Sequence, residues 1–238
     1  MDASQFYTGL VAQLYGPLRS AIPDPAPYER FVRRIGEPAL ELGCGTGDPI
    51  LALRQRGLDV DGVDSSADML AICRARALEQ GLSVDLYEQA MERLTLPRRY
   101  RSIYIAGPTF NLLADDETAL AALERISSHL EPHGAALVPL FTPTPTPEDQ
   151  LGVTRDHVTD DGTVQRVSAV SETRDEERRL QTTVLRYEST HDGVTEVLDR
   201  PWQIHWHTEQ GFAALATAAG LAVTAIRQSA FILAPAAT

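Results

Sequence analysis

The sequence predicts a doubly wound α/β fold, with a mostly parallel seven-stranded sheet, N-terminal helices and an antiparallel β insertion that serves as a lid. Three observations predict it. Apolar strand-like segments alternate with helical ones from residue 38 to residue 141, which indicates a parallel sheet covered on both faces. A glycine-rich loop follows the first of these strands. Between residues 153 and 204, strand-like runs are separated by turn dipeptides, which is typical of hairpins.

The N-terminal 35 residues predict amphipathic helices, because Leu10, Leu14 and Leu18 keep an i, i+4 spacing. We expect breaks at Gly16-Pro17 and in the proline-spaced stretch 22–27. The helix either packs on the main domain or covers a ligand site with Tyr7 or Tyr15 facing the ligand.

The following elements are predicted in order. Strands are expected at 39–42, 58–63, 84–87, 102–106 and 135–141, with helices at 49–56, from Ser65 or Ser66 to Gly81, and at 115–130. The insertion has three or four strands with turns at 161–162, 174–177 and 192–193. A helix after Thr208 and strands at 221–227 and 231–234 complete the sheet. The expected units are therefore 1–142, the insertion 143–204, and 205–238.

Composition excludes several classes of function. The chain has 238 residues and a formal charge of −12, and all 21 of its basic residues are arginine. Without lysine, Schiff-base chemistry, pyridoxal phosphate attachment and a P-loop are excluded. The negative charge disfavours nucleic acid as a partner. The two cysteines, Cys44 and Cys73, are too few for a metal cluster or a disulfide framework.

Membrane and export signals are also missing from the sequence pattern. No apolar run approaches the roughly 20 residues that span a bilayer, and residues 1–5 lack the basic-then-apolar start of a secretory signal. We therefore expect a cytoplasmic protein with no membrane partner.

The segment Glu41-Leu42-Gly43-Cys44-Gly45-Thr46-Gly47-Asp48 carries the strongest functional signal. Its glycines allow a sharp turn off the strand and a close approach of a ligand to the backbone, next to a helix N-terminus. About 20 residues later the second strand ends at Asp64, where a carboxylate can accept hydrogen bonds from both ribose hydroxyls. The pattern predicts an adenosine-bearing ligand at the carboxyl edge of the sheet.

The glycine spacing and the charges favour S-adenosylmethionine (SAM) as that ligand. In the dinucleotide fingerprint G-x-G-x-x-G the third glycine comes one place later, and here Asp48 occupies that position. A carboxylate there would repel a pyrophosphate. Glu41 suits a ligand that carries an ammonium group, and SAM carries an ammonium and a sulfonium without phosphate.

Residues 41–47, together with Gly62-Val63-Asp64-Ser65-Ser66 and Met69-Leu70, resemble class I SAM-dependent methyltransferases. The likeness extends to 99–105, 109–113 and 130–134. It implies a Rossmann-like fold and methyl transfer to an N or O atom of a small molecule. It also implies that backbone atoms of Gly43, Cys44, Gly45 and Gly47 line the methionine part of SAM. Further implied roles are Asp64 on the ribose, Ser65 and Met69 beside the adenine, and Ala106 beside the sulfonium.

One departure from the family pattern concerns the adenine. After the third strand the family often has an acidic residue for the adenine amino group and then an apolar one. This chain has Gln89-Ala90-Met91, so Ala90 and Met91 can pack on the ring while Gln89 or Glu92 replaces the acid. Tyr15 and Glu41 complete the expected cofactor set.

The segment His205-Trp206-His207 supplies the candidate catalytic residues. On a strand, both histidines point to the same face, which is the arrangement of a metal pair. We expect no metal, since no further ligands cluster at suitable spacing. His205 or His207 is instead a candidate general base. Tyr7, Asn111 and Trp206 are the expected acceptor contacts.

The sequence therefore predicts a SAM-dependent methyltransferase that acts by in-line displacement on a small-molecule acceptor, as a possible homodimer. Two alternatives stay open: a SAM-binding sensor or partner protein without transferase activity, and an NAD-dependent oxidoreductase.

Overall fold

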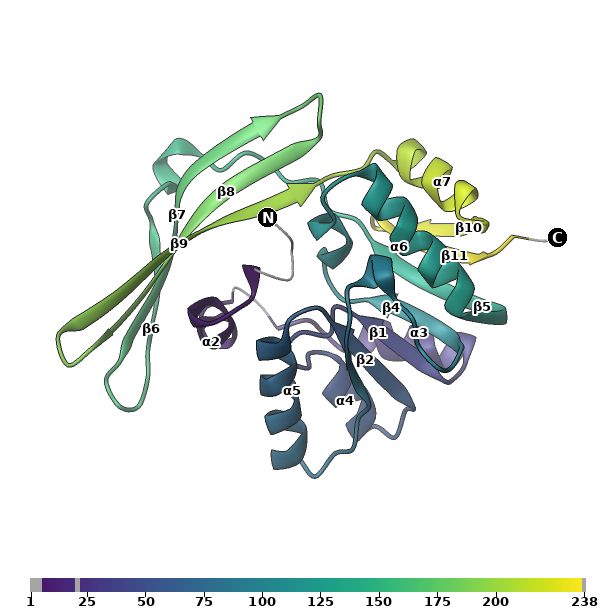
Figure 1. The fold of residues 1–238 in the computed structure, drawn as a ribbon, viewed down its shortest axis with the longest axis horizontal. Coiled ribbons are helices and arrows are strands. Elements are labelled where there is room, and N and C mark those ends of the chain that lie inside the picture. Colours follow the sequence, from purple (N-terminus) through teal and green to yellow (C-terminus); the bar gives the residue numbers. More distant parts are fainter. Residues whose placement is uncertain (1–5, 20–21, 237–238) are drawn as a thin grey trace.

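The computed structural model describes residues 6–19 and 22–236, in which two separate sheets are present (Figure 1). The strands are β1 Ala39–Leu42, β2 Val60–Asp64, β3 Leu86–Glu88, β4 Tyr100–Ile105, β5 Leu130–Pro139, β6 Thr154–Val158, β7 Val164–Asp175, β8 Leu180–His191, β9 Val194–His205, β10 Leu221–Arg227 and β11 Ala230–Pro235. The helices are α2 Leu10–Leu18, α3 Ala26–Ile35, α4 Ile50–Gln55, α5 Ala67–Glu79, α6 Asp116–His129 and α7 Glu209–Ala218, with short 3₁₀ turns η1 Met91–Arg93, η2 Thr109–Leu112 and η3 Glu148–Gln150. The expectation about a secretory signal at residues 1–5 lies outside the described residues.

The larger sheet confirms the predicted fold class. Its strand order is β10-β11-β5-β4-β1-β2-β3, and within it β11 pairs antiparallel with both β5 and β10. The chain starts in the middle at β1, runs to β3 at one edge, and then crosses back to β4. This reversal places a crevice at the carboxyl ends of β1 and β4, where ligands bind in sheets of this kind.

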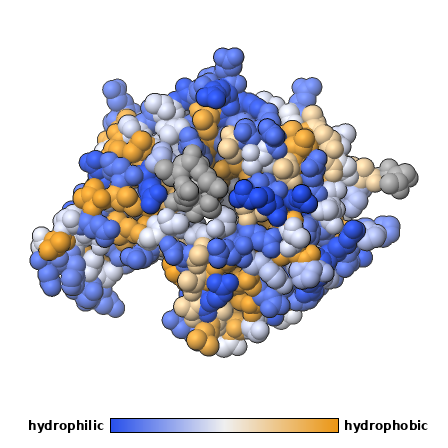
Figure 2. All heavy atoms as spheres, in the orientation of Figure 1, coloured by the Kyte–Doolittle hydropathy of each residue, from blue (hydrophilic) through white to orange (hydrophobic). Residues whose placement is uncertain are grey.

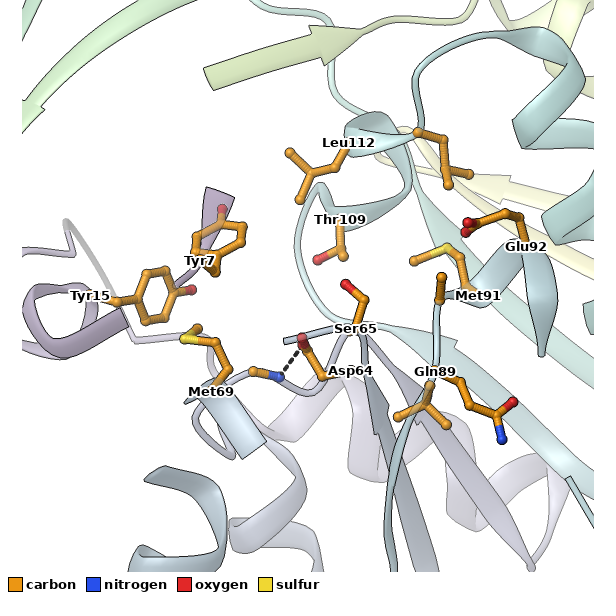
Figure 3. Close-up of a pocket in the computed structure, with 15 residues that line it drawn as sticks. Tyr7, Tyr15, Asp64, Ser65, Met69, Gln89, Met91, Glu92, Thr109 and Leu112 are labelled. Carbon is orange, nitrogen blue, oxygen red and sulfur yellow. Dashed lines mark hydrogen bonds between the residues drawn. The ribbon is translucent and has the colours of Figure 1, made fainter. Parts of the chain in front are cut away.

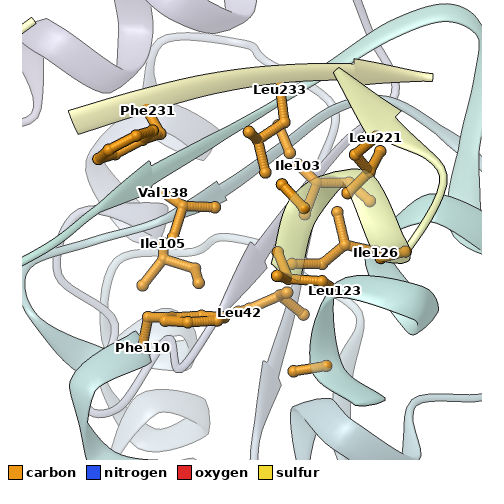
Figure 4. Packing of buried hydrophobic residues seen from close by; sticks show 14 of the residues in the cluster. Leu42, Ile103, Ile105, Phe110, Leu123, Ile126, Val138, Leu221, Phe231 and Leu233 are labelled. Atoms are coloured by element: carbon orange, nitrogen blue, oxygen red, sulfur yellow. The ribbon is translucent and has the colours of Figure 1, made fainter. Parts of the chain in front are cut away.

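Two apolar layers bury this sheet. One face is covered by α6 and α7, through a cluster that includes Ile126, Phe212 and Phe231 (Figure 4). The opposite face is covered by α3, α4 and α5. Every residue of β1 is buried, which is why its sequence shows no alternation. The core therefore holds the carboxyl ends of the strands firmly in place.

The smaller sheet, β6-β7-β8-β9, is antiparallel and is called here the insertion sheet. Two of its three turns fall where the sequence places them, at 161–162 and 192–193. The turn expected at 174–177 lies at 176–179, because β7 continues to Asp175. Figure 1 shows the insertion sheet extending away from the larger sheet, with α2 between the two. Leu10, Leu14 and Leu18 of α2 pack with Val167 and Tyr187 of the insertion sheet. The first helix is therefore held by the insertion as well as by the core.

Two expected boundaries are wrong. The helix α2 continues through Gly16-Pro17 and ends at Leu18. Pro17 lies in the last turn, so its missing N–H removes only one hydrogen bond at an end that is already frayed. Apolar packing of the leucine stripe holds that turn in place. Strand β5 begins at Leu130 instead of residue 135, directly after α6.

The surface mixes hydrophilic side chains with separate apolar patches (Figure 2). Val158 and Val194, which are 61% and 73% exposed, lie at turns of the insertion sheet. Among the helices of residues 6–19 and 22–236, none has both the length and the apolar character that crossing a membrane requires.

Candidate active site

The glycine-rich loop 43–48 leaves β1 where side chains have no room. Gly43 has a φ of +72°, and a Cβ at this position would lie 2.5 Å from Thr109 Cγ2. Only glycine adopts this conformation without strain. The N–H groups of Gly43 and Cys44 both donate to the carbonyl oxygen of Val63, at 2.7 and 2.9 Å. The loop is therefore tied to the end of β2.

Asp64 ends β2, and the loop holds its carboxylate. Oδ2 accepts the N–H of Gly45 at 2.8 Å (Figure 3), and Oδ1 accepts the N–H of Ser66 at 2.9 Å. Burial raises the pKa of Asp64, while these backbone donors oppose the shift. A carboxylate offers about four acceptor positions, so positions remain for ligand hydroxyls. This side chain is placed to accept hydrogen bonds from a ribose.

Asp64 lines a pocket between the carboxyl ends of β1 and β2, α2 and η2. About 710 Å³ of space, part of it open to solvent, lies between the pocket walls. Its lining includes two carboxylates, those of Asp64 and Glu92, and no arginine or histidine among the described residues. The lining residues are Tyr7, Tyr15, Gly43, Gly45, Val63, Asp64, Ser65, Met69, Gln89, Ala90, Met91, Glu92, Thr109, Leu112 and Leu113. Such a lining suits a cationic adenosine ligand better than a phosphate.

The cover of the pocket comes from α2 and the residues just before it. The rings of Tyr7 and Tyr15 meet edge to face with centroids 5.5 Å apart, and Figure 3 shows both beside the loop. Burial is the main cause that raises the pKa of each hydroxyl, so both stay protonated at neutral pH. Ser66 Oγ donates to the carbonyl oxygen of Tyr7 at 2.5 Å. This bond ties the cover to the same helix cap that holds Asp64.

The structure separates the two candidates for the adenine amino group. The amide of Gln89 bonds twice to the backbone of Thr95, at 2.7 and 3.0 Å, and Figure 3 shows it turned away from the pocket. Glu92 instead lies beside Met91 at the pocket wall. Glu92 is therefore the acidic group available at that end.

Glu41 lies behind the loop and outside the pocket lining. Tyr104 Oη donates to its Oε2 at 2.8 Å, while Oε1 is buried and accepts no hydrogen bond. Burial raises the pKa of Glu41 well above its usual value, and the bond from Tyr104 only partly opposes this. An orphaned carboxylate oxygen in this position fits the ammonium group of a bound ligand.

Three other expected cofactor contacts also lie outside the lining. Cys44 is buried, and its thiol lies in the apolar cluster with Cys73. A Cβ on Gly47 would meet Leu51 and Cys73, so this glycine allows helix packing. Ala106 follows β4, and its carbonyl oxygen accepts the hydroxyl of Thr109 at 3.2 Å. Their roles as backbone contacts to a cofactor stay predictions.

The expectation that Asp48 repels a pyrophosphate is wrong. The Asp48 carboxylate is bound by Arg76 at 2.6 and 3.0 Å and by Arg19 at 2.9 Å. These arginines outweigh burial and lower the pKa of Asp48. Because its charge is neutralised locally, Asp48 does not repel a phosphate as expected. The case against a phosphate ligand rests on the pocket lining and the glycine spacing.

The two candidate bases do not reach the pocket. The side chains of His205 and His207 are 4% and 0% exposed. His207 packs on Phe110 of η2, with ring centroids 5.7 Å apart, whereas Thr109 and Leu112 of the same turn line the pocket. The expectation of no third ligand-type side chain is wrong, since Asp116 joins the pair. Asp116 lies about 90 residues from the two histidines along the chain, so no local sequence pattern indicates their contact.

Asn111 and Trp206 also lie away from the pocket lining. The Asn111 amide donates to the carbonyl oxygens of His205 and Phe141 and accepts the N–H of Phe141, so its polar atoms are used. Trp206 is covered by the guanidinium of Arg174, which lies 4.1 Å from the ring centroid. Neither side chain lines the pocket, and their roles as acceptor contacts stay predictions.

Sequence reasoning missed four lining residues, namely Val63, Thr109, Leu112 and Leu113. The segment 109–113 belongs to the resemblance noted above. Its apolar pattern gave no reason to choose the individual side chains that face the pocket.

Comparisons with known proteins agree with this geometry. Residues 39–134 match the family described as methyltransferase domain. Over 140 residues the chain is 31% identical to a dTDP-3-amino-3,6-dideoxy-alpha-D-glucopyranose N,N-dimethyltransferase of Streptomyces fradiae, a match that covers 56% of this chain and 53% of that protein. The chain spans about half of the length of the first curated relatives it matches.

Solved structures match over nearly the whole chain. The CcbJ methyltransferase of Streptomyces caelestis superposes with a TM-score of 0.79 at 21% identity, covering 100% of both chains. SAM-bound CalS10 of Micromonospora echinaspora, an amino pentose methyltransferase, gives 0.70 at 20% identity, covering 95% of this chain and 97% of the other. At these identities the likeness shows a shared fold.

Proposed function

We propose that the protein transfers a methyl group from SAM to an amine of a small molecule, a function that the match of residues 39–134 to the methyltransferase domain family supports. The observation that carries the proposal is the half-buried carboxylate of Asp64, fixed by Gly45 and Ser66 at the end of β2. It leaves acceptor positions for the ribose in a pocket whose charged lining side chains are both acidic.

The residues present fit this cofactor. Asp64 would hold the ribose, Met69 and Met91 would enclose the adenine, and Glu92 would accept from its amino group. Glu41, with its orphaned Oε1, would balance the ammonium charge. The bound cofactor would supply one thing, an electrophilic methyl group on a sulfonium, for in-line attack by the acceptor.

An amine acceptor suits the side chains that line the pocket better than a hydroxyl does. A neutral amine has a free lone pair, whereas a hydroxyl acceptor needs a base to take its proton. The pocket lining contains no histidine among its described residues, and the tyrosines stay protonated. The hydroxyls of Tyr7 and Tyr15 would orient the amine, and their rings would exclude water. Such alignment contributes up to about 7–11 kcal/mol in the best intramolecular cases.

The names of related proteins favour an amino sugar. The relative from S. fradiae acts on a dTDP-linked amino sugar, and CalS10 is an amino pentose methyltransferase. We propose an acceptor of this class for the present chain. The insertion sheet and α2 would form its cover.

The test is an assay of amino sugars against their hydroxy counterparts in which the amine is replaced by oxygen. We expect S-adenosylhomocysteine and an N-methylated product, by mass spectrometry, from amines only. Transfer to the hydroxy counterparts at equal rates would contradict the choice of amine. Binding of SAM without transfer to any acceptor in the assay would favour a SAM-binding protein without transferase activity.

A further inference from the structure

A second cluster of polar side chains lies where the insertion sheet joins the core. His205 is the last residue of β9, His207 lies just before α7, and Asp116 is the first residue of α6. Each offers one ligand atom, and these atoms all lie within 4.8 Å of one another. The three residues come from segments about 90 positions apart, so only the folded chain assembles them.

Four polar atoms of this cluster lack hydrogen-bond partners. Asp116 Oδ1, His205 Nδ1 and both ring nitrogens of His207 are buried without a hydrogen bond. The His207 side chain is 0% exposed. A buried imidazole with neither nitrogen satisfied costs free energy unless water or an ion completes it. The unpartnered ring nitrogens of His207 are a second observation that points to a ligand. This observation is independent of the clustering of the three residues.

One of the distances matches that between two ligands of a single ion, and the other is longer. His207 Nδ1 lies 3.3 Å from Asp116 Oδ1, and His205 Nε2 lies 3.8 Å from the same oxygen. Two ligands bound at about 2.0 Å to a tetrahedral zinc ion lie about 3.3 Å apart. The rings of His205 and His207 meet at 82° with centroids 4.7 Å apart, so they do not stack.

The surroundings orient the carboxylate and leave an entry path. Arg179 donates to Asp116 Oδ2, which turns Oδ1 toward the histidines as an outer-shell partner does in metal sites. Asp116 is 46% exposed, so an ion and a water ligand can enter from its side. Two imidazoles and one carboxylate are donors that zinc accepts, with an open fourth position.

We propose that Asp116, His205 and His207 bind one zinc ion that fastens the insertion sheet to α6. The ion would lie outside the cofactor pocket, on the opposite side of η2. Its function is structural: it joins the end of β9 to the core and fixes the root of the insertion sheet. This site does not depend on the proposed methyl transfer.

The test uses the full chain freed of metal with a chelator and titrated with Zn²⁺ by calorimetry and with Co²⁺ by visible absorption. We expect one ion per chain, tetrahedral ligand-field bands from Co²⁺, and a higher melting temperature with Zn²⁺. His207→Ala should weaken binding by more than the roughly 10–100-fold that outer-shell changes cost. Asp116→Asn provides a second variant at a half-exposed position, in case the histidine variant does not fold.

His157→Ala is the matched control, because His157 is an exposed histidine on β6. It should bind the ion as the unaltered chain does. Absence of Co²⁺ bands and of zinc heat in the unaltered chain would overturn the proposal. Affinity that stays unchanged in both His207→Ala and Asp116→Asn would overturn it as well.

Discussion

The two walls of the pocket are built from different kinds of structure. The core wall consists of turns that follow buried parallel strands, and hydrogen bonds such as the one from Gly45 to Asp64 fix it atom by atom. The cover wall carries Tyr7 and Tyr15. Apolar packing of α2 against the insertion sheet holds it on one side, and the hydrogen bond from Ser66 Oγ to the carbonyl oxygen of Tyr7 ties it to the core. Directional hydrogen bonds suit the recognition of one invariant cofactor, whereas apolar packing tolerates substitution of the packed side chains.

We infer from this difference that the two walls have separate functions. We expect changes in the core wall to alter cofactor affinity and changes in the cover wall to alter the use of the acceptor. Four variants test whether the two walls have these separate functions.

The largest effect is expected from Asp64→Ala. It removes the acceptor of two ribose hydrogen bonds to a charged group, so SAM affinity should fall about 100-fold or more. Calorimetric titration with SAM measures this. Asp85→Ala, at an exposed carboxylate in the turn before β3, is the control and should bind normally. If the two variants bind SAM with equal affinity, Asp64 does not hold the cofactor.

Gly43→Ala should damage the core wall through sterics. The new Cβ would clash with Thr109 Cγ2 at 2.5 Å on a residue with φ of +72°, and backbone strain of this kind costs of order 1–3 kcal/mol. We expect a lower melting temperature and weaker SAM binding. Gly57→Ala has the strain of a φ of +80° but no neighbour within 4 Å. A drop in melting temperature as large in Gly57→Ala would show that the contact with Thr109 adds nothing.

Tyr7→Phe tests the cover wall. It removes one hydroxyl, worth about 0.5–1.5 kcal/mol in a typical hydrogen bond, so kcat/KM for the acceptor should fall about 2–12-fold. The SAM dissociation constant should not change. Steady-state kinetics and calorimetry measure the two quantities separately. If Tyr7→Phe weakens SAM binding instead, the cover wall also binds the cofactor and the two walls do not have separate functions.

The smallest effect is expected behind the core wall, from Glu41→Gln. Burial raises the pKa of Glu41 above the unfolded value of 4.5, so the folded chain binds more protons and loses stability as pH rises through the folded pKa. The neutral variant should therefore melt higher than the unaltered chain at pH 8, and the gap should close as pH falls toward 4.5. Its SAM affinity should be lower. A gap that stays constant with pH would mean that Glu41 is not the titrating group.

The core wall could be predicted from sequence because its signals are local. Gly43, Gly45 and Asp64 lie within about 20 residues and belong to one strand-turn-helix pattern. The charge of Asp48 was misjudged because it depends on distant contacts. Arg19 and Arg76, which lie 29 and 28 residues away along the chain, neutralise it.

The region after residue 204 shows the same limit. The alternation of His205-Trp206-His207 predicts both histidines on one face of a strand. In the structure β9 ends at His205, and the His207 ring still lies 4.7 Å from the His205 ring. The alternation does not indicate that this face meets Asp116 instead of the pocket, because the packing of β9 against α6 decides that. Likewise, the carbonyl oxygens that occupy Asn111 belong to Phe141 and His205, which no local pattern connects to it.

The most direct test is a crystal structure of the full chain grown with S-adenosylhomocysteine. We expect both ribose hydroxyls on the Asp64 carboxylate, the adenine between Met69 and Met91, and its amino group at Glu92. A ligand bound elsewhere, or one whose ribose does not contact Asp64, would contradict this expectation.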